Sequence, residues 1–306
     1  MNKFFSNIID DARRAPSVLN SQPWRLRVCG NTIEVYLEKR SELEPVDSGG
    51  RLQVASCGTL IAHLENAFME RGRSTKVTYF PRFEEQNLVA FIEASGTAGV
   101  KSAHGPAVTK TAPALGEMEP GGHIKEEIAS LAARKEIGLV IHDDRSERKI
   151  QTYLKKHCSE KLNSEQFRKS LNLFLRSDTS EASIPFEDEV LMSDRFFDFY
   201  STDGSNSEVG QDPTGNEFII LTTGSDNRFD WIRAGEVLGN VIIRLRNKRQ
   251  SGLMALPIIS NDNCREWLQK ELNLSGFPQF VLRAQQVRPT EHKQKRPLKE
   301  VLKYGF

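Results

Sequence analysis

The sequence lacks the short motifs that mark many cofactor- and metal-dependent enzymes. It has no GxGxxG fingerprint of the classical dinucleotide-binding fold, no GxxxxGK phosphate loop and no HExxH zinc motif. Its four cysteines are scattered without a CxxC pair, so we expect free thiols in a reducing cytoplasm. These absences exclude the usual nucleotide-binding loops and give no case for a metal site.

The sequence also lacks an imbalance of charge and a long apolar run. Lys and Arg total 42 against 41 Asp and Glu, which gives no reason to expect a nucleic acid or a membrane as partner. No apolar stretch approaches the roughly 20 residues of a transmembrane helix, and the apolar patch near the N-terminus is followed by acids, unlike a signal peptide. We expect a soluble, cytoplasmic protein of one large domain or two ordinary ones.

Hydrophobic periodicity predicts helices that alternate with strands. Residues 51–71 place apolar side chains at i, i+3, i+4 and i+7, the pattern of a helix with one buried face. Alternating apolar residues on both sides of Gly30-Asn31 predict a β-hairpin. The other expected helices are 2–14, 123–134, 147–158, 164–176, 229–248 and 263–272, and the other expected strands are 76–80, 88–93, 218–223, 252–256 and 279–284.

Two stretches in the middle of the chain differ in composition from the rest. Residues 96–122 are rich in Gly, Ala, Pro and Thr without periodicity, which predicts a linker. Residues 186–217 carry nine acids and one base together with five aromatic residues. This segment is either a lid that closes over a flat apolar ligand or a surface loop pinned by a small aromatic cluster.

The two ends of the chain show a similar order of elements. A helix containing Gly58 leads to a strand that stops at Pro81, and a helix containing Gly235 leads to a strand that stops at Pro257. Helices followed by strands indicate an α/β or α+β fold. If the halves are copies, the chain is a fused dimer whose two-fold interface lies inside one polypeptide.

The stretch ARRAPSVLNSQPWRLRV, from Ala12 to Val28, predicts an ordered loop just before a strand. Two prolines within eight residues rule out a continuous helix, and ordered loops often carry function. Ser17 and Asn20 can bind a ligand, or they can close the turns of the loop itself. Trp24 fits a core position.

Together, APSVLNSQPWRLRV, DSGGRLQVASCGTLIAHLENA, WIRAGEVLGNVI, GFPQFVLRA and KRPLKEVL resemble the nitroreductase superfamily, and within it the Acg-type proteins. In these proteins two nitroreductase units are fused in one chain. The resemblance implies an α+β fold of two tandem units that form an intrachain pseudo-dimer with a lid segment. It divides the chain into a first unit (1–95), a linker (96–122) and a second unit (123–306) that includes the lid and the tail.

The resemblance also implies FMN bound between the two units. The residues expected to line its ring are Pro16, Ser17, Val18 and Asn20, and those expected to hold its phosphate are Lys295 and Arg296, together with Arg134 and Lys135. The last pair stands where the family has the first two arginines of an arginine-rich motif. The final arginine of that motif is replaced by Gly138, and Glu136 adds a negative charge, which should weaken or abolish FMN binding.

The implied activity is transfer of hydride or electrons from reduced FMN to an electron-poor acceptor such as a nitroaromatic compound or a quinone, with NAD(P)H as the electron donor. This chemistry requires no catalytic acid or base from the protein, and we name no catalytic residue. Three other functions stay open: storage or sequestration of flavin, a cofactor-free binding protein of the same fold, and a flavin-consuming or product-specific redox enzyme of the same fold. An internal pseudo-dimer is expected to be a monomer in solution.

Overall fold

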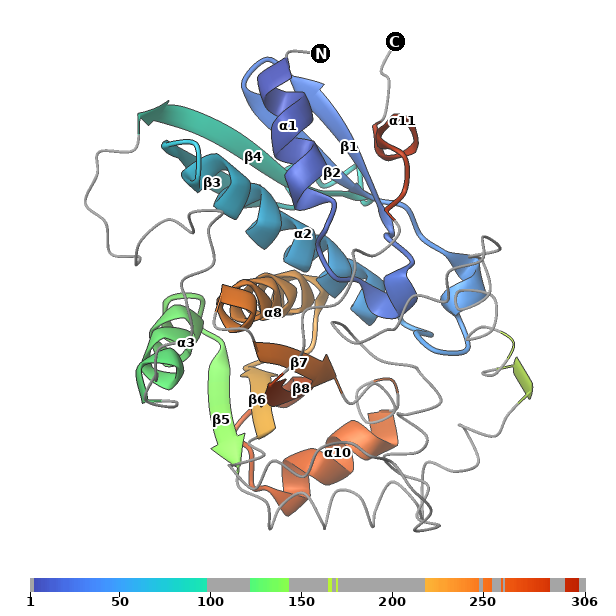
Figure 1. The fold of residues 1–306 in the computed structure, drawn as a ribbon. Helices are drawn as coiled ribbons and strands as arrows, with labels where there is room; N and C mark the ends of the chain where they lie inside the picture. The colour runs from blue at the N-terminus through green and yellow to red at the C-terminus, as the bar shows by residue number, and fades with distance from the viewer. Residues whose placement is uncertain are drawn as a thin grey trace.

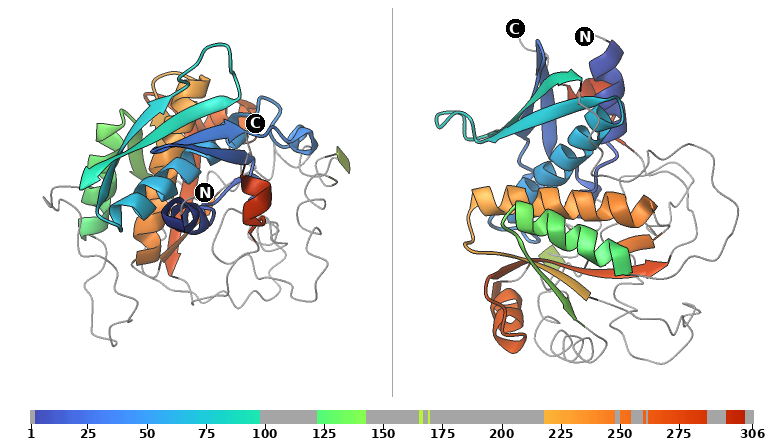
Figure 2. Two further views of the ribbon diagram at one scale, coloured as in Figure 1. Left: turned by 90° about the horizontal axis from the view of Figure 1, so that it is seen from above. Right: turned by 90° about the vertical axis from the view of Figure 1, so that its left-hand side faces the viewer.

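The computed structural model describes residues 3–97, 122–142, 165–166, 169, 218–247, 250–254, 260, 262–286 and 295–302. These residues form two four-stranded antiparallel sheets with two long helices between them (Figure 1). The right-hand view of Figure 2 shows the layers: a sheet, a helix, a second helix and the other sheet. The architecture is mixed α and β, as expected from the alternating patterns.

The first half builds one sheet and one central helix. Its strands pair in the order β1-β2-β4-β3, and the short turns η1 (Val18–Asn20) and η2 (Ser41–Leu43) lie in the loops around them. The elements are α1 (Lys3–Ala12), β1 (Trp24–Cys29), β2 (Thr32–Leu37), α2 (Arg51–Met69), β3 (Arg73–Tyr79) and β4 (Leu88–Thr97).

The second half repeats this order around its own central helix. Its strands pair as β5-β6-β8-β7, with the same chain order along the sheet as in the first half. The elements are α3 (Gly122–Arg134), β5 (Gly138–His142), β6 (Phe218–Thr223), α8 (Arg228–Asn247), β7 (Gln250–Met254), α10 (Asp262–Glu271) and β8 (Phe277–Gln286), and α11 (Leu298–Val301) follows in the tail. Strand β5 and helix α11 were not predicted from the sequence, whereas the other described helices and strands begin and end within a few residues of their predicted bounds.

Helices α2 and α8 touch through glycines, and the contact is reciprocal. A Cβ added at Gly58 would lie 2.1 Å from the carbonyl oxygen of Ile232, three positions before Gly235. A Cβ added at Gly235 would lie 2.0 Å from the carbonyl oxygen of Ala55, three positions before Gly58. Only glycine allows the two backbones to approach this closely.

The loop before β1 connects two hydrophobic cores. Ala15 and Trp24 pack into the core under the first sheet, and Trp24 is fully buried, as its sequence context indicated. Val18 and Leu19 instead pack into the core under the second sheet. We call the contact region between the two halves, around α2 and α8, the seam; the loop lies across it.

One expectation from the sequence is wrong: Cys264 on α10 is disulfide-bonded, whereas Cys29 and Cys57 are free. Wide separation along the sequence does not prevent two cysteines from meeting in a folded chain. The expected helix 147–158, the lid 186–217 and most of the expected helix 164–176 and of the linker 96–122 lie outside the described residues; of 164–176 the structure describes residues 165, 166 and 169, which are helical. No helix in the described part of the chain is long and apolar enough to span a membrane.

Candidate functional site

The loop from Pro16 to Pro23 has an unusual backbone. Leu19, Asn20 and Gln22 have φ values of 47°, 51° and 45°, in the left-handed region that residues other than glycine rarely adopt. The hydroxyl of Ser17 accepts a hydrogen bond from the backbone N–H of Gln22 at 3.0 Å. Strained residues of this kind persist only where the surroundings hold them, and they cluster at ligand sites.

Helix α2 holds the first part of this loop. The backbone N–H of Val18 donates to the hydroxyl of Ser56 at 3.0 Å, and the hydroxyl of Thr59 donates to the carbonyl oxygen of Pro16. Pro16, Ser17 and Val18 are buried, whereas Asn20 is partly exposed. Asn20 is therefore the member of the predicted ring-lining set that solvent reaches in the structure.

The tail holds the second part of the loop. The backbone N–H of Arg296 donates to the side-chain oxygen of Gln22, and its guanidinium donates to the carbonyl oxygen of Gln22, both at 3.0 Å. The same guanidinium contacts the carbonyl oxygen of Trp24 at 3.3 Å and the carboxylate of Glu38 at 2.9 Å. The structure thus brings Arg296 of the tail into contact with the predicted loop.

Lys295 adds positive charge that nearby acids do not fully offset. Its ammonium group donates to the backbone oxygen of Asp10 at 3.4 Å, while the carboxylate of Asp10 pairs with Arg13. Burial and the neighbouring charge of Arg14 lower the pKa of Lys295 below its ordinary value. An anion placed here would be stabilised, since it would relieve the repulsion between like charges.

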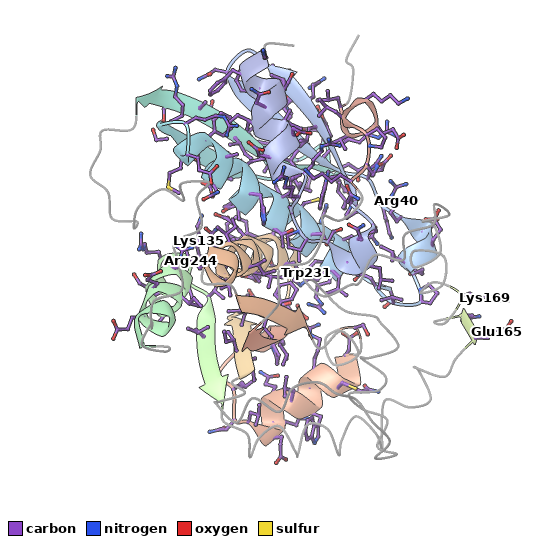
Figure 3. The ribbon with its side chains drawn as sticks, viewed as in Figure 1. Arg40, Lys135, Glu165, Lys169, Trp231 and Arg244 are labelled. Atoms are coloured by element: carbon purple, nitrogen blue, oxygen red, sulfur yellow. The ribbon has the colours of Figure 1, made fainter. Side chains whose placement is uncertain are left out.

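Arg134 and Lys135 lie away from this loop. Lys135 pairs with the carboxylate of Glu236 on α8, and its backbone oxygen accepts a hydrogen bond from Arg233. Arg134 contacts Ser130 of its own helix. In Figure 3, Lys135 lies beside α3, far from Arg40, which precedes the start of α2.

The segment before β5 sits on α8 as the loop before β1 sits on α2. Ser56 and Thr59, which bind the first loop, stand two positions before and one position after Gly58. Arg233 and Glu236, which bind Lys135, stand two positions before and one position after Gly235. Lys135 therefore lies against α8 at the position that corresponds to the position of the loop against α2.

An acidic pair, the buried Glu236 and the partly buried Glu65, lies next to Lys135. Burial and the charge of Glu236 raise the pKa of Glu65 on α2 to about 8, although Lys135 acts in the opposite direction. The hydroxyl of Tyr79 also contacts Glu236, and burial raises the pKa of that phenol. Among the described residues, no cluster of three or more His, Cys, Asp or Glu could hold a metal ion.

Sequence reasoning missed a polar network that crosses the seam. The guanidinium of Arg51 donates to the backbone and side-chain oxygens of Gln279 at 3.1 and 3.0 Å, and the Gln279 amide donates to Asp226 at 3.0 Å. Asp226 in turn pairs with Arg265 at 2.9 Å. Burial and the nearby Arg265 lower the pKa of Arg51 to about 9. No local motif indicates these partners, because they come from opposite halves of the chain.

The loop and its surroundings fit a flavin with a phosphate tail. Within the part of the chain that the structure describes, the hydroxyl of Ser21 is buried without a hydrogen-bond partner, and so is the indole N–H of Trp24. Unpaired buried polar groups cost about 1–3 kcal/mol each, and a ligand that supplies a partner for Ser21 would relieve that cost. Lys295 supplies a nearby cation for a phosphate.

Comparison with known proteins finds relatives in Mycobacterium tuberculosis (strain ATCC 25618 / H37Rv). One, an uncharacterized protein, is 24% identical over 294 residues, covering 89% of this chain and 83% of the relative. Another, named "Putative NAD(P)H nitroreductase Rv3131", is 25% identical over 295 residues, covering 89% and 82%. A third, named "Putative NAD(P)H nitroreductase acg", is 33% identical over 93 residues, covering 30% and 28%. No family model matches the chain.

Proposed function

From the chain's relationship to the nitroreductases, we propose that it is an FMN-dependent oxidoreductase. When bound, FMN would supply the hydride and electron transfer that side chains cannot carry out. The proposed electron donor is NAD(P)H, and the proposed acceptor is an electron-poor small molecule such as a nitroaromatic compound or a quinone. The observation that supports this most directly is the strained loop that lies across the seam.

The two halves are proposed to be copies of one nitroreductase unit, with boundaries at 1–95, 96–122 and 123–306. Three observations support the duplication: the same strand order in both sheets, the reciprocal contacts of Gly58 and Gly235, and the matching positions that bind the two pre-strand segments. An internal pair of this kind has no need of a second chain, so we expect a monomer of 34.6 kDa in solution.

Each loop residue has a proposed task toward the cofactor. Pro16 and Val18 would present an apolar surface to the flavin ring, and Ser17 and Asn20 would donate hydrogen bonds to its polar edge. Ser17 can do so because its hydroxyl accepts the Gln22 N–H and keeps its own proton to donate. Lys295 would neutralise part of the phosphate charge. Arg134 and Lys135 are left out of this site because Arg134 contacts Ser130 of its own helix and Lys135 pairs with Glu236 on α8.

The visible spectrum of the protein titrated with FMN tests the proposal first. We expect quenching of FMN fluorescence on binding, bleaching of the bound flavin by NADPH or NADH under anaerobic conditions, and reoxidation by a nitroaromatic compound or a quinone. A matched control is Asn31→Ala, a turn residue far along the hairpin from the loop, beside Asn20→Ala within it.

The outcomes separate the proposal from its alternatives. Bleaching and reoxidation that are reduced in Asn20→Ala and kept in Asn31→Ala support the oxidoreductase. Flavin that binds but accepts no electrons from either nucleotide would overturn the activity and indicate storage. A protein that binds no flavin at all would overturn the cofactor as well.

A further inference from the structure

The guanidinium of Arg296 contacts the loop before β1, Glu38 and the backbone of its own tail. Its guanidinium donates to the backbone oxygens of Gln22, Trp24 and Glu300 and to the carboxylate of Glu38. Its own backbone oxygen accepts a hydrogen bond from Arg13. A planar guanidinium with fixed donors suits such a site, which a lysine could not fill in the same way.

Glu38 fixes the position of this guanidinium. Burial alone would raise the pKa of Glu38, yet hydrogen bonds and charges from Arg25, Arg40 and Arg296 hold it below its ordinary value. Glu38 also belongs to the same backbone network, since its N–H donates to the carbonyl oxygen of Pro23 at 3.0 Å. The acid is therefore held charged beside the loop and keeps Arg296 in place.

Gln22 transmits these contacts to the loop. It has a left-handed backbone, and Arg296 binds both its carbonyl oxygen and its side-chain oxygen. On its other side the Gln22 N–H binds the hydroxyl of Ser17, and its side-chain amide approaches the carbonyl oxygen of Asn20 at 3.5 Å. A short chain of hydrogen bonds thus leads from the tail to both polar residues of the proposed cofactor loop.

We propose that Arg296 is a positioning residue, which acts through Gln22 to hold the loop in its strained conformation, rather than a ligand of the flavin phosphate. The inference rests on the proposed function, because the loop is the proposed flavin site. It assigns the tail of the second half a role in shaping the site on the first half. A strained loop that is held ready binds its ligand without first having to be ordered.

The affinities for FMN and for riboflavin, which lacks the phosphate, distinguish the two roles. If Arg296 positions the loop, Arg296→Ala weakens both flavins by a similar factor, about 10-fold to 100-fold for the loss of a charge-assisted contact. Arg296→Lys, which keeps the charge, weakens both as well. Glu38→Gln, which removes no cation, weakens both to a smaller extent.

Arg82→Ala is the matched control. Arg82 is exposed and pairs with Glu85 at 2.7 Å, and no contact joins it to Glu38 or Gln22 in the described structure. Its removal changes the charge by the same amount and should leave both affinities within about twofold, as expected for an exposed pair.

Amide hydrogen exchange gives a readout that needs no flavin. We expect faster exchange of the Gln22 and Trp24 amides in Arg296→Lys and Glu38→Gln, with the amides of α8 unchanged, which also shows that the variants are folded. Loss of FMN affinity with riboflavin affinity unchanged would overturn the inference and leave the proposed function standing. Wild-type protein that binds neither flavin would overturn the proposed function, while unchanged loop exchange in the variants would overturn the inference.

Discussion

Replacing Glu65 with Gln should remove one source of pH dependence from the free energy of unfolding, because a glutamine in this contact across the seam cannot ionise. Glu65 on α2 faces Glu236 on α8, and Lys135 and Thr75 lie on the other sides of the acidic pair. In the folded chain the pKa of Glu65 is about 8, compared with 4.5 for an ordinary glutamate. The folded protein therefore holds a proton on Glu65 over a pH range in which the unfolded chain has released it.

The sign of the effect follows from this difference in bound protons. Because the folded state binds the extra proton, Glu65 contributes its full stability below the ordinary carboxyl pKa and loses it as the pH rises toward 8. The loss is at most about 1.4 kcal/mol for each pH unit. Between pH 6 and pH 7.5 we expect the free energy of unfolding to fall by about 2 kcal/mol relative to Glu65→Gln, whose amide cannot ionise.

Urea denaturation followed by tryptophan fluorescence measures this difference. The wild type, Glu65→Gln and the surface control Glu70→Gln are unfolded at several values between pH 5 and pH 9. Glu70 is exposed, directly follows the last residue of the same helix, and is therefore a control for removal of one acid. If the free energies of wild type and Glu65→Gln run parallel across the whole range, the raised pKa and the buried contact inferred here are wrong.

Three further predictions follow from the packing. Gly58→Ala places a Cβ 2.1 Å from a backbone oxygen of α8 and should lower the free energy of unfolding by about 1–3 kcal/mol or more, whereas Gly49→Ala meets nothing within 4 Å and should have little effect in the same urea titration. Asn20→Gly removes a left-handed strain and should leave the melting temperature unchanged or raise it, while it weakens flavin binding through loss of the amide. Arg265→Ala removes a buried guanidinium that donates to the carbonyl oxygen of Pro278 at 2.8 Å and pairs with the exposed Asp226, and it should destabilise the chain by about 1.5–3 kcal/mol, measured by thermal unfolding; an unchanged melting temperature would contradict this role.

The long elements of the fold could be predicted because their signals are local. The apolar periodicity of residues 51–71 and 229–248 and the turn at Gly30 specify structure over short distances. Strand β5 was missed because five residues, Gly138–His142, carry little periodicity, and their partner strand β6 begins at Phe218. Helix α11 has four residues, and its Val301 is buried in the first core, so tertiary contact stabilises it rather than sequence preference.

The candidate site could be predicted only in part, because local sequence signals indicate the loop but not its tertiary contacts. The loop is visible in the sequence because its prolines and small polar residues stand out. The sequence does not indicate which group a cation contacts. Arg296 could bind a phosphate or the backbone of Gln22 with no difference in the local sequence. Lys135 was assigned to a phosphate, but the fold places it against Glu236, more than a hundred residues later in the chain.

The docking of the tail onto β1 has a consequence for synthesis on the ribosome. Leu302 pairs with Leu26 of β1, which is an edge strand of the first sheet, and Arg296 contacts the loop before it. Residues 3–97 are made well before residues 295–302 exist. At a synthesis rate of 5–20 residues per second, this strand edge and this loop stay uncovered for roughly 10–40 s until the tail has been made. During that interval the first half depends on chaperones, or on its own short edge, to avoid pairing with another nascent chain.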